Sequence, residues 1–318
     1  MYLLRILRRL APGVLLAVAL AACAAPPETA RLRATPGGLP TQADVAGVPF
    51  IPQQENYCGP ASLAMALAWS GAPVDQEAVA PQVFTPGREG TMRADMLAAA
   101  RRNGRLAVPV GNLEDLLAEL AAGHPVIVFQ NLSLDWYPVW HFAVATGYDL
   151  ASGEIRLHSG LERDLRMPLA TFERTWARGN RWAMVVLPPE KLPATAGEVE
   201  VLQAAAGLER VGRLAEASKA YAAILQRWPD NFAARMGLGN ARYGMGDITG
   251  AEAAFRAAIA RQQTSGAAWN NLAQSLADQN RLAEAREAAR RALALGGADA
   301  NLYRATLQEI EDKQLQKN

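Results

Sequence analysis

The chain has 318 residues, half of them hydrophobic, and a formal net charge of +1. This length favours two domains, and the apolar content is sufficient for a sizeable core. Lysine and arginine are spread along the chain without a basic stripe, which argues against nucleic acid as a partner.

Residues 1–22 are predicted to be an export signal. Arg5, Arg8 and Arg9 form a basic region, and a short apolar stretch over residues 13–20 follows it. The stretch is shorter than the roughly 18 residues that a membrane-spanning helix requires. No other apolar run in the sequence reaches that length.

The sequence Leu-Ala-Ala-Cys at residues 20–23 resembles the lipobox of bacterial lipoproteins, in which the cysteine takes up a diacylglycerol group. The resemblance implies that Cys23 is lipidated and anchors the protein in the bacterial cell envelope. Because alanine and not aspartate follows the cysteine, it implies the outer membrane, facing the periplasm. An ordinary secretory signal with an incidental cysteine is the alternative.

Residues 23–46 are predicted to be a flexible tether that holds the rest of the chain away from the membrane. They contain proline and glycine with few large apolar residues. Such a segment buries too little apolar surface to fold by itself.

Residues 47–189 show the pattern of an α+β domain. Helices are predicted over residues 61–69, 91–103, 112–122 and 168–176, and strands over 126–130, 140–147, 155–158 and 182–187. A turn at residues 149–153 indicates that the two middle strands form a hairpin. Helices that precede antiparallel strands favour the α+β class.

Beyond a proline-containing linker at residues 190–197, the chain repeats itself with a period of 34. Four columns carry the repeat: Gly212, Gly246 and Asn280; Leu214, Ile248 and Leu282; Ala217, Ala251 and Ala285; Tyr221, Phe255 and Ala289. The pattern resembles the tetratricopeptide repeat. It implies an all-α solenoid of three helix pairs over residues 198–299, followed by a capping helix and tail at 300–318. A plain helical bundle is the alternative.

Stacked helix pairs form a concave groove that binds peptides, so we expect a protein partner there. Polar side chains that interrupt the apolar helical spacing are candidate contacts: Arg235, Asn240, Trp269, Asn270 and Gln274. A solvated polar face is the alternative interpretation.

Cys58 is the candidate nucleophile. Lipidation would consume Cys23, the only other cysteine, and would leave Cys58 without a disulfide partner in the chain. Gly59 and Pro60 indicate that a helix begins at Cys58, where free N–H groups and the helix dipole stabilise a thiolate. This position predicts a thiol pKa below the ordinary value of about 8.5. A buried, inert cysteine is the alternative.

The residues around Cys58, Pro-Phe-Ile-Pro-Gln at 49–53 and Tyr-Cys-Gly-Pro-Ala-Ser-Leu-Ala at 57–64, resemble the active-site motif of the bacteriocin-processing, double-glycine-type cysteine peptidases. That family is papain-like. The resemblance implies a papain-like domain that hydrolyses peptide bonds of peptide or protein substrates without a cofactor or metal ion. It also implies that Gln53 helps to form the oxyanion hole, with Gln54 as the adjacent alternative.

The segment at residues 140–149 is similar to the histidine strand of the same family, which implies that His141 is the catalytic base. A structural histidine at a strand end is the alternative. His124 lies between Gly123 and Pro125 and is predicted to be a surface turn residue.

The third catalytic position departs from the family pattern. The family usually has an aspartate on the next strand, whereas this chain has Leu-His-Ser-Gly at residues 157–160. We expect His158 to orient His141, with a backbone carbonyl or a water as alternatives, and we expect Asp149 to lie too far away. The departure leaves a second function open, in which an inactive peptidase fold serves as a binding scaffold through its repeats. A cell-wall amidase ranks third, because such enzymes usually carry Asp-Cys-Ser-Gly at this point.

Overall fold

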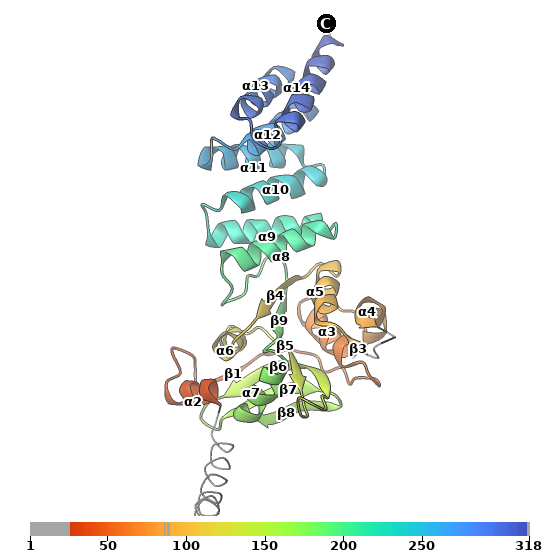
Figure 1. Cartoon of the computed structure of the whole chain (residues 1–318), viewed down its shortest axis with the longest axis vertical. Helices are drawn as coiled ribbons and strands as arrows, with labels where there is room; N and C mark the ends of the chain where they lie inside the picture. Colours follow the sequence, from red (N-terminus) through yellow and green to blue (C-terminus); the bar gives the residue numbers. More distant parts are fainter. Residues whose placement is uncertain (1–25, 86, 88–89, 317–318) are drawn as a thin grey trace, which may run out of the picture.

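The computed structural model describes residues 26–85, 87 and 90–316 (Figure 1). A mixed α and β domain forms one end of the molecule, and a stack of helices extends from it to the C-terminal end. Within the described ranges, no helix is both long and apolar enough to cross a membrane. The predicted signal and Cys23 lie outside the described residues.

The prediction of a flexible tether is wrong for the part of residues 23–46 that the structure describes. Helix α2 (Pro27–Ala34) buries Leu32 completely, and β1 (Gln42–Asp44) pairs with the main sheet. The buried carboxylate of Glu173 accepts hydrogen bonds from Thr29 N at 2.7 Å and from Thr29 Oγ1 at 2.6 Å. Residues 27–44 are therefore ordered by the Glu173 carboxylate, which lies far away in the sequence, and by the pairing of β1 with β6. The low apolar content of the segment does not reveal either interaction.

The main sheet is antiparallel throughout and follows the order β4-β9-β5-β6-β7-β8, with β1 pairing with β6 beside this path. Its strands are β4 (Leu106–Val110), β5 (Val126–Asn131), β6 (Trp140–Asp149), β7 (Glu154–Ser159), β8 (Glu162–Pro168) and β9 (Ala183–Leu187). Strands β6 and β7 form the predicted hairpin. The unpredicted β4 is an edge strand, where the missing N–H of Pro109 is tolerated.

Five helices and a small hairpin accompany the sheet in the described part of the domain after β1. They are α3 (Cys58–Trp69), α4 (Gln76–Val83), α5 (Arg93–Arg102), α6 (Leu113–Ala121), α7 (Leu169–Arg178) and the pair β2 (Phe84–Thr85) and β3 (Gly90–Thr91). As predicted, α3 is buried on nearly all sides, and it packs on β6. The Asn112 side chain caps α6 by accepting a hydrogen bond from Asp115 N at 2.8 Å, also as predicted.

The helical part consists of three helix pairs and a final helix, which is the expected repeat architecture. The pairs are α8 (Glu198–Arg210) with α9 (Leu214–Arg227), α10 (Phe232–Gly244) with α11 (Ile248–Arg261), and α12 (Gly266–Asp278) with α13 (Leu282–Leu295), followed by α14 (Ala300–Leu315). Gly212, Gly246 and Asn280 have φ angles of 77°, 81° and 62°. These residues provide the left-handed turn inside each pair, as their column in the sequence predicted.

The repeats are joined to the first domain by packing and by polar contacts. Helix α8 packs on β4 and α5, and Arg213 Nε donates to the Arg102 carbonyl at 2.7 Å. The fully buried carboxylate of Glu119 accepts from Thr195 N and Oγ1 at 2.8 and 2.7 Å, which fixes the linker. The prediction of His124 as a surface residue is wrong, because its Nδ1 lies 2.7 Å from Glu119 Oε2 and its side chain is only 12% exposed.

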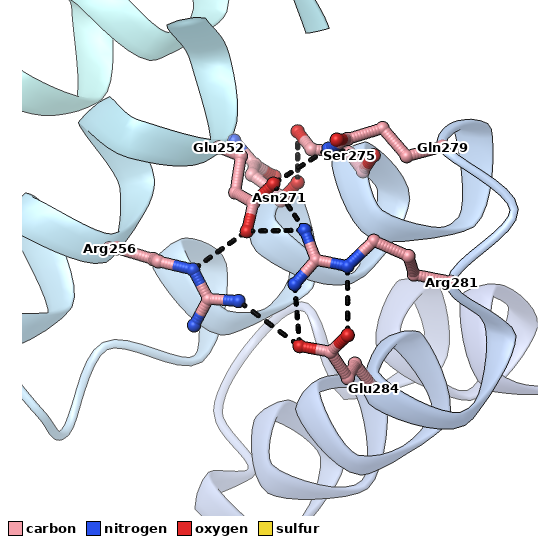
Figure 2. A network of polar contacts seen from close by, with 7 residues as sticks. All are labelled: Glu252, Arg256, Asn271, Ser275, Gln279, Arg281 and Glu284. Carbon is pink, nitrogen blue, oxygen red and sulfur yellow. Dashed lines mark hydrogen bonds and ion pairs between the residues drawn. The ribbon is translucent and has the colours of Figure 1, made fainter. Parts of the chain in front are cut away.

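Glu252 connects the second repeat to the third (Figure 2). Its carboxylate accepts from Arg281 Nη1 at 2.8 and 2.7 Å, from Gln279 Nε2 at 2.8 Å and from Arg256 Nε at 2.8 Å. Burial raises the Glu252 pKa, but these hydrogen bonds outweigh it and lower the pKa to about 2. Glu284 pairs with the other side of the Arg281 guanidinium. The junction between the repeats therefore depends on an ionised carboxylate.

Candidate active site

Cys58 is the first residue of α3 and lines a cleft of about 400 Å³. The chain enters the helix through Asn56, whose φ of 61° is left-handed. The cleft is lined by Asn56, Cys58, Gly90, Thr91, Met92, Phe129, Trp140 and Phe142. Gly59 permits the close approach of β3, because a Cβ at this position would lie 2.4 Å from Thr91 Oγ1. The nucleophile thus stands at the start of a buried helix, with one side open to the cleft.

His141 lies on β6, next to the strand residue that contacts the thiol. A backbone hydrogen bond links Cys58 to Phe142, the residue that follows His141. The Nε2 atom of His141 lies 2.8 Å from Ser159 Oγ on β7. Burial lowers the pKa of His141, which keeps the imidazole neutral near pH 7. A neutral imidazole can accept a proton, as a base must.

The expectation that His158 orients His141 is wrong. The His158 ring is 4% exposed, its Nε2 lies 3.3 Å from the Val48 carbonyl oxygen, and it packs edge-on against Phe50. In the pairing of β6 with β7, His158 lies opposite Val144 and Leu157 lies opposite Ala145. Neighbouring strand residues point to opposite faces, so His158 shares a face with Val144, whereas Ser159 lies on the other face with His141. Ser159 therefore meets the histidine, and the alternation of side chains along the predicted strand was the only signal in the sequence that could have indicated it.

The thiol of Cys58 does not have the lowered pKa that its position predicted. Burial raises the pKa, and backbone hydrogen bonds from Phe142, Gly59 and Cys58 itself only partly oppose this effect. The helix start supplies the expected N–H groups, but desolvation of the charged form outweighs them. At rest, therefore, the thiol of Cys58 and the imidazole of His141 are both neutral.

Gln53 lies beside the strand connection that follows Ser159. Its backbone N–H donates to the Gly160 carbonyl at 3.1 Å, and its side-chain oxygen is buried without a hydrogen-bond partner among the described residues. Gln54 is exposed and its side chain is bound to Glu77. Of the two glutamines, Gln54 has its amide nitrogen bound to Glu77, and Gln53 is the one that contacts the connection after β7.

In the repeats, a pocket of about 160 Å³ contains two of the five predicted contact residues. It is lined by Asn240, Tyr243, Phe255, Asn271 and Gln274. Three predicted residues lie elsewhere: Asn270 is 4% exposed, Trp269 Nε1 donates to the Gln263 carbonyl at 3.0 Å, and the Arg235 guanidinium donates to the Pro229 carbonyl. Asn271, one position after the predicted Asn270, also lines the pocket.

Comparison with known protein families agrees with this two-part organisation. Residues 45–184 match the Peptidase C39 like family, and residues 202–243 and 237–300 match the tetratricopeptide repeat. No curated protein matches the chain. In the described residues, no group of three or more His, Cys, Asp or Glu side chains is arranged to hold a metal ion.

Solved structures similar to this chain resemble one part of it or the other. A C39-like peptidase from Bacillus anthracis is 21% identical, covers 46% of this chain and 97% of its own, and has a TM-score of 0.40. The type III secretion translocator chaperone SycD from Yersinia enterocolitica is 19% identical, covers 36% of this chain and 84% of its own, and has a TM-score of 0.35. The TPR2B domain of yeast Sti1, in a complex described as pHsp70, is 16% identical over 36% of this chain and 97% of its own, with a TM-score of 0.36.

Proposed function

We propose that this peptidase C39-like domain, joined to tetratricopeptide repeats, hydrolyses peptide bonds with Cys58 as nucleophile and His141 as base. The observation that carries the proposal is the hydrogen bond between Cys58 and the backbone of Phe142, since Phe142 is the neighbour of His141 on β6 and lines the same cleft as the thiol. Ser159 engages Nε2 of the histidine. The other ring nitrogen, Nδ1, is the one that takes the thiol proton.

The chemistry begins from the neutral pair. His141 removes the Cys58 proton while the sulfur attacks the substrate carbonyl carbon, which gives a tetrahedral intermediate. The imidazolium then protonates the leaving amine as the carbon–nitrogen bond breaks, and a thioester remains on Cys58. His141 next deprotonates water, whose oxygen attacks the thioester carbon. The carbon–sulfur bond then breaks, the acid product leaves, and the imidazolium returns its proton to the Cys58 sulfur.

Two further side chains support this sequence of steps. The Ser159 hydroxyl holds the imidazole in one orientation, as the third group of a catalytic triad does. The Gln53 amide and the backbone N–H of Cys58 donate to the oxygen that gains negative charge in the intermediate. Gln53 would donate through Nε2, and its buried Oε1 has no hydrogen-bond partner among the described residues.

The repeats are the partner-binding part of the proposal. The pocket between Asn240, Asn271 and Gln274 lies on helices of two consecutive repeats, where a bound peptide would contact both. We further propose that Cys23 is lipidated and that the protein is anchored in the cell envelope, at the outer membrane. A Cys23→Ser variant should then leave the membrane fraction, and equal fractionation of variant and wild type would refute the anchor.

A second candidate function, an inactive scaffold, draws on two observations. The partner of His141 is a hydroxyl group and not a carboxylate, and the Cys58 pKa is raised. Peptide libraries incubated with the protein and read by mass spectrometry separate the two functions. Peptidase activity predicts cleavage by the wild type, none by Cys58→Ala and almost none by His141→Ala. Equal product levels in all three, or none with any library, would favour the scaffold.

A further inference from the structure

The segment between β5 and β6 exposes an unusual number of large apolar side chains. Trp136 is 81% exposed and Tyr137 is 67% exposed, and three others are about half exposed: Leu132, Leu134 and Val139. Trp140, the first residue of β6, is also about half exposed. We call residues 132–139 the apolar loop. Isolated apolar side chains are common on protein surfaces, but a contiguous group of them marks a site of interaction.

The apolar loop is held in one conformation by the buried side chain of Asn131. Its Oδ1 accepts from Ser133 N and Val139 N, both at 3.0 Å, and its Nδ2 donates to the Leu134 carbonyl at 3.2 Å. Across the loop, Tyr137 N donates to the same carbonyl at 3.1 Å. The apolar side chains are therefore presented by an ordered backbone, which reduces the entropy lost when a partner binds.

The loop is continuous with the cleft that contains Cys58. Trp140, the residue that follows the loop, stacks on Phe129 with ring centroids 5.2 Å apart and planes 12° apart. Phe129 in turn packs on Phe142 at 4.6 Å, and all three rings line the cleft. The other described lining residues are uncharged, so nothing in that lining favours a charged substrate side chain.

We propose that the apolar loop and the three aromatic rings form one recognition surface for the substrate, which is an extended peptide with large apolar side chains beside the scissile bond. This inference rests on the proposed peptidase function. One side chain stacks on Trp140 inside the cleft, and the next residues lie across Leu134, Trp136 and Tyr137.

The size of the cleft supports this occupant. A cleft of about 400 Å³ has room for only a few residues of a peptide. An extended peptide advances roughly 3.3–3.6 Å with each residue, so a longer peptide extends beyond the cleft. The remainder of a bound peptide must leave the cleft over its rim, and the apolar loop lies on the rim next to Trp140. A peptide with apolar side chains in this stretch buries the exposed surface that the loop presents.

Binding measured without catalysis tests the inference. The Cys58→Ala protein is titrated with fluorescent octapeptides that carry Leu, Phe or Trp at successive positions on a glycine–serine background, and with the unsubstituted peptide. We expect an apolar peptide to bind at least about tenfold more tightly than the unsubstituted one. The preference should be lost with Trp140→Ala and reduced with Leu134→Ala. It should persist with Leu302→Ala, whose side chain on α14 is 57% exposed compared with 53% for Leu134.

Thermal melting of each variant identifies any loss of binding that is due to unfolding. The absence of a preference, or a preference that survives both Trp140→Ala and Leu134→Ala in folded protein, overturns the proposal. Two further outcomes overturn the proposal. Leu134→Ala could leave peptide binding intact but abolish binding to phosphatidylglycerol vesicles, which would show that the loop binds a lipid surface. It could instead abolish self-association with peptide binding intact, which would show that the loop binds a second copy of the protein. Hydrolysis by the wild type is measured separately. Peptides that bind with the expected preference but are never cleaved refute the peptidase function and leave the recognition surface standing.

Discussion

The imidazole Nε2 of His141 lies 2.8 Å from the hydroxyl oxygen of Ser159, and the two residues come from neighbouring strands of the β6–β7 hairpin. A neutral hydroxyl group can hold the ring in place, but it does little to stabilise the imidazolium. Burial meanwhile lowers the His141 pKa. The site therefore favours a neutral His141, and the pH dependence of kcat/KM should reflect the pKa of this histidine.

Replacement of Ser159 should change both the rate and the pH profile. Ser159→Ala leaves the ring unheld, and we expect kcat/KM to fall about tenfold, less than the roughly 100- to 10,000-fold that a general base supplies. Ser159→Asp places a carboxylate beside the imidazolium and raises the His141 pKa, so the acid limb of the profile should move to higher pH. An acid limb that stays in place in Ser159→Asp would show that this residue does not contact the working histidine.

Alkylation of Cys58 by iodoacetamide should report the raised thiol pKa. Burial favours the protonated form, so the rate should rise with pH to a midpoint above the ordinary thiol value of about 8.5. The measurement follows the mass of the labelled peptide containing Cys58 over a pH series. A midpoint below 7 would contradict the structure and support the activated thiolate that the helix position alone suggests.

Gly59→Ala should disturb the cleft. The new Cβ would lie 2.4–2.7 Å from three atoms of Thr91, a residue with a stiff β-branched side chain. We expect a loss of about 1–3 kcal/mol in the free energy of unfolding, typical of overpacking, together with a lower kcat/KM. Gly111→Ala is the matched control, since no atom lies within 4 Å of the Cβ it would add. Equal melting temperatures for the two variants would contradict this account of Gly59.

Glu252→Gln should weaken the junction between the second and third repeats. The change removes one of the two carboxylates that Arg281 and Arg256 contact and leaves them Glu284, and we expect a loss of about 2 kcal/mol in denaturant unfolding. Glu284→Gln, at a carboxylate that is half exposed, is the control and should cost less.

The same junction predicts a pH dependence. The Glu252 pKa is about 2 in the folded protein and about 4.3 in an unfolded chain. The contribution of Glu252 to the free energy of unfolding is therefore fully present above the unfolded pKa. That contribution is lost as the pH falls through the folded value. The stability difference between wild type and Glu252→Gln should therefore begin to shrink below about pH 4 and continue to shrink toward pH 2, and a constant difference down to pH 2 would refute the assignment.

The sequence predicted what local patterns determine. Apolar periodicity located α3 and the strands of the hairpin, and the column of Gly212, Gly246 and Asn280 located the turns of the repeats. Cys58 and His141 were selected as candidate site residues because each lies in a local motif. Both patterns depend on residues close in the chain, so a single sequence contains them.

The features that the sequence missed depend on distant pairing. Helix α2 folds because Glu173, 144 residues away, accepts the Thr29 N–H. Ser159 replaces His158 because the pairing of β7 with β6 places His158 opposite Val144, on the face away from His141. The raised Cys58 pKa reflects burial by the whole domain. In each case the decisive partner is set by tertiary packing and not by a neighbouring residue.

Labelling with a peptidyl vinyl sulfone tests the central claim, that Cys58 and His141 act together as a peptidase pair. Such a probe needs both an activated thiol and a substrate cleft, whereas iodoacetamide needs only an accessible thiol. We predict one adduct on Cys58 in the wild type, at least about a hundredfold slower labelling in His141→Ala, and similar iodoacetamide rates for the two proteins. Equal vinyl sulfone labelling with and without His141, or none in a wild type that iodoacetamide alkylates, would contradict the account.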